Sequence, residues 1–314
     1  MQELTISNLT CPFTAHTNPH GVGTDDETGA WIEKFGLDER LLELTEHDTY
    51  GPFCAMLYPY GESREGLQLA SDGLAWAETF HDRYIKEPAL SGHLGWVSRS
   101  LMALSRVVDD PHGAPEEDDP YHRAWRDLWL RLERLATPAQ FARAAAGWAY
   151  WSRGLASEAI CLSKGRLPCL PDFRMIRRAK TASRLFIVFP ELISGDPLPE
   201  QVWAHPQVLR LQDLAADAVG YYSDITLFDR EADPSTAMTL PSVLAGHHKF
   251  SLQEGLFQAA DMYRDTLEEF TVVGRSLREM GDPQITRCVR DAEAMIAGFS
   301  HWQQLTGRNS PARE

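Results

Sequence analysis

Apolar residues recur every three to four positions along most of the chain, and this spacing predicts amphipathic helices. The stretches with this pattern are Leu69–Tyr84, Trp96–Val108, Tyr121–Leu135, Ala139–Ile160, Met175–Ile193, Val208–Leu227, Leu256–Met280 and Thr286–Leu305. Strict alternation of apolar and polar residues, which is typical of strands, is nearly absent. Proline and glycine fall between the stretches, as at Pro88 and Pro171, and indicate where helices end. The pattern therefore predicts an all-α bundle of roughly ten helices.

The same pattern shows no internal repeat and no linker, so it predicts a single domain. We place a helical domain at residues 28–308, with a mobile N-terminal segment at 1–27 and a C-terminal tail at 309–314. The 314 residues are enough to bury one large core. The segment Asp109–Asp119 is acidic and contains two prolines. We interpret it as a solvated loop, because proline after its Asp-Asp pair disfavours helix.

Composition and charge narrow the class of partner. The net charge of −15 repels phosphate backbones and anionic lipid, which argues against nucleic acid and membrane surfaces. No apolar run approaches the roughly 20 residues that span a bilayer. The N-terminus has no apolar leader, so a cytoplasmic location is expected. The five cysteines fit no zinc or disulfide spacing and are interpreted as reduced thiols.

A helix at residues 71–87 carries the first candidate site. Its sequence, SDGLAWAETFHDRYIKE, resembles the helix W-x-F-x-x-D-D-x-x-D of bacterial class I terpene synthases. Trp76 and Asp82 match this register, and Phe80 keeps an aromatic residue beside the motif. Glu78 replaces the phenylalanine of the pattern, and His81 replaces its first aspartate. The resemblance implies the helix that binds Mg²⁺, with one of its ligands exchanged.

A second segment, YSDITLFDRE, resembles the N-D-x-x-S-x-x-x-E metal motif of that family. Asp224 and Glu231 are kept, and Arg230 occupies the basic position before the glutamate. Ser223 replaces the asparagine, and Leu227 replaces the serine ligand. Leucine cannot bind a metal ion, and Mg²⁺ prefers oxygen ligands in octahedral geometry. The usual three-metal cluster is therefore not expected, although four candidate metal ligands remain: Asp82, Ser223, Asp224 and Glu231.

Basic and aromatic positions of the family also recur in order. FRMIRRAKT resembles the helix with the diphosphate-sensing arginine, which falls at Arg177 or at Arg178. The spacing between the sensor and Ser223 fits Arg177. The position of Thr181 instead fits a register shifted by one residue, which would make Arg178 the sensor. WQQLTGRN resembles the closing W-x-x-x-x-x-R-Y and keeps Arg308. The resemblance implies these candidates for binding the diphosphate or the substrate: Arg177, Arg178, Arg230, Arg308, Trp76, Phe80, Phe186, Tyr221 and Trp302.

Glu78 is a substitution that adds an ionisable group. Helical spacing places its side chain within one turn of His81 and Asp82. Beside an apolar cavity, desolvation would favour the neutral acid, and His81 would relay or hold its proton. We therefore take Glu78, His81 and Asp82 as catalytic candidates. The alternative is a surface glutamate that contacts His81, and the two interpretations weigh about equally. Half of a di-metal site is disfavoured, because the chain has no second Glu-x-x-His.

The resemblance runs over residues 50–309 and implies a helical bundle with a central apolar cavity. Our first hypothesis is an enzyme that cyclises or rearranges an isoprenoid or terpenoid through a carbocation, without the usual three-Mg²⁺ ionisation. The alternatives are an Mg²⁺-dependent prenyl diphosphate cyclase and a non-catalytic terpenoid-binding or partner protein. No other cofactor is implied. Family members often pair, so the resemblance also implies a homodimer.

Overall fold

The computed structural model describes residues 9–37, 50–113, 119–228 and 237–306, and within these ranges it contains helices and no strands. The all-α prediction is confirmed. In chain order the helices are η1 (Pro19–Gly21), α1 (Thr24–Phe35), α3 (Tyr50–Leu57), α4 (Arg64–Phe80), η2 (His81–Lys86), α5 (Glu87–Leu90), α6 (Leu94–Asp109), α7 (Pro120–Leu135), α8 (Pro138–Ser163), α9 (Leu170–Lys180), α10 (Ser183–Phe186), α11 (Phe189–Ser194), α12 (Glu200–Trp203), α13 (Pro206–Thr226), α14 (Leu240–His248), α15 (Leu252–Glu279) and α16 (Pro283–Leu305).

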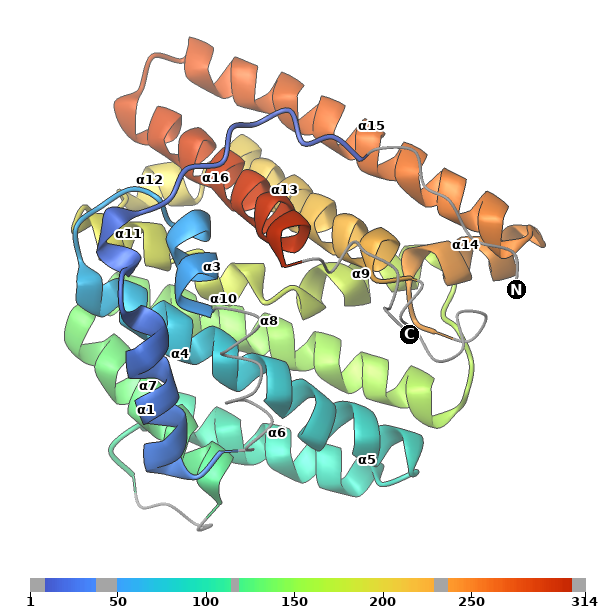
Figure 1. The fold of residues 1–314 in the computed structure, drawn as a ribbon, viewed down its shortest axis with the longest axis horizontal. Coiled ribbons are helices and arrows are strands. Elements are labelled where there is room, and N and C mark those ends of the chain that lie inside the picture. The colour runs from blue at the N-terminus through green and yellow to red at the C-terminus, as the bar shows by residue number, and fades with distance from the viewer. Residues whose placement is uncertain (1–8, 38–49, 114–118, 229–236, 307–314) are drawn as a thin grey trace.

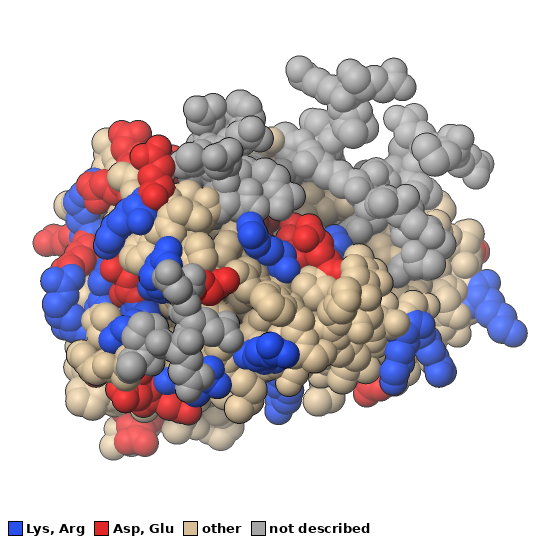
Figure 2. Space-filling view, turned by 90° about the horizontal axis from the view of Figure 1, so that it is seen from below, with Lys and Arg blue, Asp and Glu red and all other residues tan. Residues whose placement is uncertain are grey.

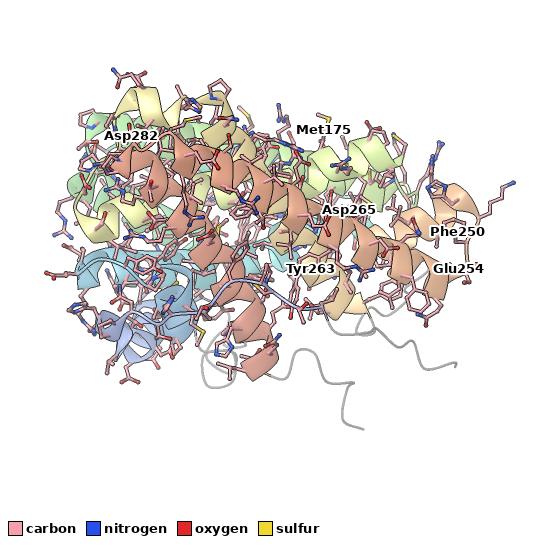
Figure 3. The ribbon with its side chains drawn as sticks, turned by 90° about the horizontal axis from the view of Figure 1, so that it is seen from above. Met175, Phe250, Glu254, Tyr263, Asp265 and Asp282 are labelled. Carbon is pink, nitrogen blue, oxygen red and sulfur yellow. The ribbon has the colours of Figure 1, made fainter. Side chains whose placement is uncertain are left out.

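Local sequence signals explain where the two longest helices begin. Before α8, the Thr137 hydroxyl accepts a hydrogen bond from the Gln140 backbone N–H. In turn, the Gln140 side-chain oxygen accepts a hydrogen bond from the Thr137 backbone N–H. Ser251 and Glu254 form the same reciprocal capping box before α15. Each box satisfies N–H groups that the first helical turn leaves without partners. Figure 3 looks down on α15, which runs from Glu254 towards the turn that contains Asp282.

The helices, whose arrangement Figure 1 shows, pack around two buried apolar clusters that meet at α16. The first cluster is built mainly from α1, α3, α4, α6, α7, α8, α10 and α11. The second is built mainly from α13, α14, α15 and α16. Met295 and Phe299 of α16 pack against both clusters and join them. The two clusters therefore form one continuous bundle.

The bundle begins earlier in the chain than the sequence suggested. Phe13 packs its ring against Phe270 at a centroid distance of 5.4 Å. Asn18 donates two side-chain hydrogen bonds, to the carbonyls of Tyr58 and Gly61. Residues 9–27 are thus held by the core, and the boundary at residue 28 is wrong for them because these long-range contacts leave no periodic signal. Residues 1–8 and 309–314 lie outside the described ranges.

The end of α4 also departs from expectation, because Pro88 does not end the helix. The chain instead widens into the π-helical turn η2 and continues through Pro88 into α5. In an α-helix each backbone N–H donates to the carbonyl four residues earlier, and proline has no N–H to donate. A local change of helical winding accommodates this missing bond. The backbone N–H of Glu87 donates to the carbonyl of Asp82, five residues before it. This local widening begins at His81, one of the catalytic candidates.

The visible surface carries charged side chains of both signs (Figure 2). Figure 2 shows acidic and basic side chains intermixed on one face, most densely at one end. No helix in the described part of the chain has both the length and the apolar character that crossing a membrane requires. All five cysteines carry free thiols, as the sequence suggested.

Candidate active site

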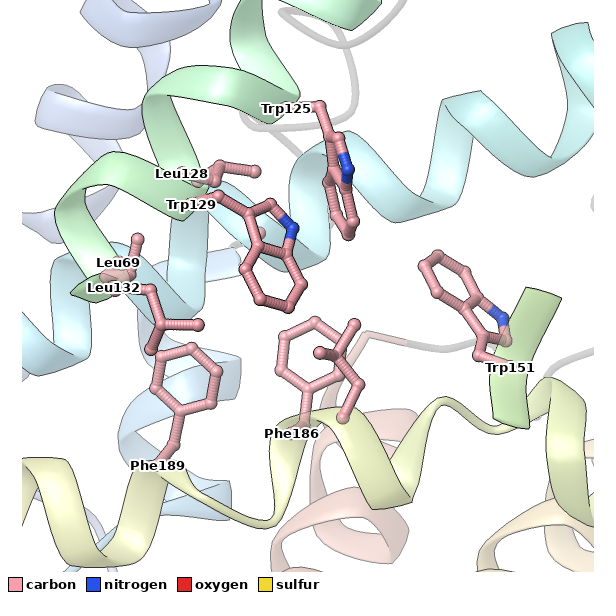
Figure 4. A pocket seen from close by; sticks show the side chains of 10 residues that line it. Leu69, Trp125, Leu128, Trp129, Leu132, Trp151, Phe186 and Phe189 are labelled. Carbon is pink, nitrogen blue, oxygen red and sulfur yellow. The ribbon is translucent and has the colours of Figure 1, made fainter. Parts of the chain in front are cut away.

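An apolar cavity lies between α4, α7, α8, α10 and α11 (Figure 4). Its walls carry five aromatic rings together with leucine side chains and one glycine, and none of these residues is ionisable. The lining residues are Leu69, Gly73, Trp125, Leu128, Trp129, Leu132, Trp151, Leu185, Phe186 and Phe189. Ring faces attract cations, so this lining can stabilise positive charge without supplying a nucleophile.

Helical spacing explains why α7 supplies four of the residues that line the cavity. Trp125 is followed by Leu128, Trp129 and Leu132 three, four and seven residues later, so the four side chains share one face of the helix. Opposite them, Gly73 of α4 lets the Phe186 ring approach closely. A Cβ atom at position 73 would lie 3.4 Å from the nearest carbon of that ring. The missing side chain thus sets the position of Phe186 in the wall.

A network of charged side chains joins three helices where α4 passes into η2. His81 Nε2 lies 2.8 Å from Glu158 Oε2, and the other oxygen of Glu158 accepts from Lys180 of α9. His81 Nδ1 lies 3.4 Å from Asp82 Oδ1. The Glu158 side chain is 4% exposed, so its charge is removed from solvent. The network ties α4, α8 and α9 together around one buried carboxylate.

The charges in this network support one another. Burial alone would raise the pKa of Glu158, but the Lys180 ammonium and the His81 ring outweigh it and hold the pKa well below its usual value. Burial alone would likewise lower the pKa of His81, but the charge of Glu158 outweighs it and raises the pKa. The network therefore favours an ionised Glu158 and a protonated His81. A protonated imidazole is a proton donor.

Asp224 of the second motif is held by hydrogen bonds within the protein. Asp224 is buried, and its Oδ1 accepts from Arg177 Nε at 2.8 Å. Its Oδ2 accepts from the backbone N–H of Leu240 at 3.0 Å. Both oxygens are therefore engaged within the protein. The side chain fixes the start of α14 against α9 and α13.

Both candidate sensor arginines are held by α13. Arg177 also donates to the carbonyl of Gly220 at 3.1 Å. Arg178 donates from Nε to Asp217 at 2.8 Å and from a terminal nitrogen to Asp213 at 3.2 Å. Neither arginine is thereby distinguished as the sensor. Their binding of a diphosphate stays a proposal.

The described candidates do not fit a Mg²⁺ cluster. Within the described ranges, no group of three or more His, Cys, Asp or Glu side chains is placed to hold a metal ion. Asp82 is more than half exposed and lies beside His81. Both carboxylate oxygens of Asp224 already accept hydrogen bonds from the protein. Ser223 supplies only a neutral hydroxyl, whereas Mg²⁺ demands near-octahedral oxygen ligands. Three candidates lie outside the described ranges, namely Arg230, Glu231 and Arg308.

The expectation that Glu78 is desolvated beside the apolar cavity is wrong. Glu78 is exposed, whereas His81 is half-buried. Trp76 and Phe80 continue the stripe of α4 that begins with Leu69 and Gly73, and Glu78 lies on the opposite side of the helix. Its side chain therefore faces away from the aromatic cavity, where the proposed role as an acid would require it.

Of the five predicted aromatic contacts, only Phe186 lines this cavity. Trp76 and Phe80 are fully buried and stack on each other at 4.5 Å, behind the wall. Tyr221 is buried, and its hydroxyl accepts from an arginine of α9. Trp302 is also buried and stacks on an aromatic ring of α3. Tyr221 and Trp302 are therefore packing residues, away from the described cavity.

Sequence reasoning missed the tryptophans of α7 and the partners of His81. One signal was present for Glu158, since it follows Trp151 and Leu155 at positions seven and three residues later on the same helical face. An acid within an apolar stripe requires a cationic partner. The identity of that partner, Lys180, depends on how α8 packs against α9. No spacing along the chain predicts it.

Comparison with known proteins agrees with this architecture. A family model described as terpene synthase family 2, C-terminal metal binding, matches residues 75–269. The chain is 25% identical to 4-epi-cubebol synthase of Streptosporangium roseum, with 98% of this chain and 93% of the relative covered. It is also 25% identical to (+)-(1(10)E,4E,6S,7R)-germacradien-6-ol synthase of Streptomyces pratensis, with 96% and 86% covered.

The fold is shared with solved structures at still lower identity. The SVS_A2 protein from ancestral sequence reconstruction superposes with a TM-score of 0.88 at 19% identity, covering 96% of this chain and 90% of that one. The single all-helical domain predicted from the sequence is thus confirmed over nearly its whole length. Since the family model covers more than half of the chain, the protein belongs to terpene synthase family 2.

Proposed function

We propose that the protein cyclises or rearranges an isoprenoid through a carbocation held in the aromatic cavity. The observation that carries this proposal is the lining of the cavity, which combines five aromatic rings with no ionisable side chain. Aromatic faces stabilise a cation, and the absence of nucleophiles from this wall leaves the cation to react with its own double bonds. Family membership and the names of the relatives support the substrate class.

We propose further that the carbocation forms without the usual three-metal ionisation. This is supported by the described candidates, since Asp224 has both oxygens engaged and His81 stands at a carboxylate position. A neutral terpenoid carries no diphosphate, so its carbon–oxygen bond can break without a metal cluster. An allylic alcohol would serve, because protonation of its hydroxyl lets water depart and leaves the cation.

His81 is the acid that we assign to this step, in place of Glu78. Glu158 accepts from Nε2 and favours the imidazolium, so we assign the transferred proton to Nδ1, which lies beside Asp82. Transfer to the substrate hydroxyl releases water and leaves His81 neutral. The cyclised cation then loses a proton to His81, and the imidazolium is restored. Asp82, beside Nδ1, orients the ring.

A second candidate is the Mg²⁺-dependent cyclisation of a prenyl diphosphate. The family model is named for metal binding, and one relative is printed as cyclising (2E,6E)-farnesyl diphosphate. Glu231 keeps its family position in the sequence. In this function Arg177, Arg178, Arg230 and Arg308 would hold the diphosphate. The proposed substrate would then be charged, and the metal would be required.

Turnover measurements separate the two candidates. We would incubate the protein with geranyl, farnesyl and geranylgeranyl diphosphate and with the matching alcohols, each with Mg²⁺ and with EDTA, and analyse the products. Cyclic products from an alcohol in EDTA are expected. Mg²⁺-dependent release of diphosphate would establish the second candidate instead. An absence of products from all six would favour a non-catalytic, terpenoid-binding role.

Two matched variants test the assignment of the acid. His81→Gln removes the titratable ring and is expected to lower kcat at least about 100-fold, the usual contribution of general acid catalysis. Glu78→Gln changes a neighbouring exposed carboxylate and is expected to leave kcat within about twofold, since its side chain faces solvent. If Glu78→Gln abolished turnover while His81→Gln kept it, the assignment to His81 would be wrong.

A further inference from the structure

A second cavity lies among α11, α12, α13 and α16, next to the aromatic cavity. Phe186 lines both of them, and within the described part of the chain it is the one residue that the two linings share. Beside it, Phe189 lines the aromatic cavity and Tyr58 lines the second, with their ring centroids 5.8 Å apart. A single layer of aromatic residues therefore separates the two spaces at this boundary.

Phe186 is the centre of this layer. Its ring stacks on that of Phe189 at a centroid distance of 5.5 Å, and Figure 4 shows both rings rising from the same stretch of chain into the aromatic cavity. The Tyr58 hydroxyl donates to the carbonyl of Phe186 at 3.4 Å, so the backbone is held by a residue of the second cavity. Contacts with both linings thus fix Phe186 between the two spaces.

The second cavity offers apolar surface to a hydrocarbon chain. Ile187, Leu198, Ala215, Ala292 and Met295 belong to its lining. Leu198 and Met295 are only half-buried, so a chain lying against them would remove their apolar surface from water. Such burial is favourable in proportion to the area covered. The space beyond Phe186 is therefore suited to hydrocarbon.

The two carboxylates of this cavity are already neutralised by arginine. Arg143 pairs with Glu191 at 2.6 Å, and Arg290 pairs with Asp291 at 2.8 Å. The Glu191 side chain is 1% exposed, so its charge is not offered to an occupant. These pairs balance the charges of the wall, which leaves its apolar residues to select what binds.

An isoprenoid grows by five carbons at a time, and each added unit needs apolar space of its own. The aromatic layer closes the aromatic cavity at Phe186 and shuts a chain out of the second cavity. We propose that Phe186 sets the longest isoprenoid chain that the protein accepts, and that the second cavity receives the end of a longer chain once this ring is removed. The inference rests on the proposed function for the class of ligand, but it concerns binding and needs no turnover.

Binding of isoprenoid alcohols in EDTA tests the role of Phe186. The probes are geraniol and geranylgeraniol, and the readout is quenching of tryptophan fluorescence, since Trp125, Trp129 and Trp151 line the aromatic cavity. Phe186→Ala is expected to raise the affinity for geranylgeraniol relative to geraniol at least about tenfold, because each further buried methylene favours binding. An unchanged ratio would overturn the proposal. Phe186→Leu, a smaller change to the core, should shift the ratio in the same direction and replaces the alanine variant if that one does not fold.

Phe189→Ala is the matched control. It removes the same ring from the aromatic cavity, but Tyr58 still stands between the enlarged space and the second cavity. The affinity ratio is expected to rise less than about threefold, since the added space lies on one side of the boundary. A gain as large as that of Phe186→Ala would show that added volume alone explains the effect, and would refute the role of the boundary.

Filling the second cavity locates the end of the longer chain. Ala292 lines the second cavity and not the aromatic one. Ala292→Leu alone is expected to leave the ratio unchanged, because the Phe186 ring keeps the chain out. Combined with Phe186→Ala, it is expected to abolish the tenfold gain, a coupling typical of two sites that share one space. A double variant that kept the gain would place the chain elsewhere and refute the proposal. Leu198→Phe fills the same space from a half-buried position and repeats the test if Ala292→Leu does not fold.

These results are separable from the proposed reaction. A shifted ratio without any turnover would support the role of Phe186 and count against the proposed cyclisation. Turnover with an unshifted ratio would do the opposite. If neither the wild type nor any variant bound either alcohol, the inference would fail at its first step, whatever the turnover assays show.

Discussion

Glu158 shows how a single residue sets the chemistry of its neighbours. A buried carboxylate is stable only when cations face it, and here Lys180 and His81 do so from two other helices. The same contact makes His81 easier to protonate. His81 therefore serves as a partner that stabilises the buried charge of Glu158.

The raised pKa of His81 predicts a pH-dependent stability. A histidine whose pKa is higher in the folded than in the unfolded state contributes stability below its unfolded pKa of about 6.5, and loses it as the pH rises through the folded pKa. Glu158, whose pKa is lowered, contributes above its unfolded pKa of about 4.3 and loses that contribution only in stronger acid. The network is therefore strongest between these limits.

The measurement is thermal unfolding of the wild type and His81→Gln from pH 5 to pH 9. The wild type is expected to exceed the variant most at pH 5–6, and the difference should shrink as the pH rises. Glu78→Gln serves as the control, since Glu78 is an exposed carboxylate on the same stretch of helix. A difference that grew with pH would contradict the protonated state of His81.

At the scale of elements, close packing of α8 on α9 and α10 fixes the walls of the aromatic cavity. Two glycines of α8 permit it. A Cβ atom on Gly147 would lie 2.4 Å from the carbonyl oxygen of Arg184, and one on Gly154 would lie 2.6 Å from the Cβ of Ala179. The contact at Gly147 meets backbone, which cannot move aside as a side chain can. Helix α8 can therefore carry Trp151 and Glu158 close to their partners.

Gly147→Ala is expected to destabilise the protein by about 2 kcal/mol, the usual cost of overpacking, and to disturb the position of Phe186. Chemical denaturation measures the loss. The control is Gly29→Ala in α1, where a new Cβ would meet no atom within 4 Å. Alanine favours helix over glycine by up to about 1 kcal/mol, so this variant should be neutral or stabilising. Equal effects of both variants would refute the packing argument.

At the scale of the whole molecule, two cores meet at α16, and the candidate groups are divided between them. The first core carries His81 and Glu158, whereas Asp224 lies on α13 of the second. A metal cluster would have to bridge the two. The described residues instead satisfy their charges within the protein, through pairs such as Arg177 with Asp224.

This division predicts how the protein responds to metal. Inorganic diphosphate with Mg²⁺ is expected to raise the unfolding temperature no more than diphosphate with EDTA, because a ligand stabilises only as far as it binds the folded state. Differential scanning calorimetry at matched ionic strength makes the comparison. An additional Mg²⁺-dependent rise of several degrees would show that a working cluster assembles after all.

The sequence by itself determined the class of fold and the family. Apolar spacing of three to four residues is a local property of helices, and motifs at fixed intervals survive as patterns along one chain. The prediction of altered metal motifs at His81 and Leu227 also came from the sequence alone, because ligand chemistry depends on residue type. The helix containing Glu78 was recognised, although the side that faces the described cavity was not.

Tertiary packing decided what those residues do. Glu78 is exposed and Trp76 is buried because the cavity forms along the Gly73 side of α4, and helical periodicity alone does not say which neighbour covers which side. Lys180 meets Glu158, and Arg177 meets Asp224, only because α8, α9 and α13 come together. Charge pairing and burial are set by distances between segments far apart in the chain, which only the folded structure brings together.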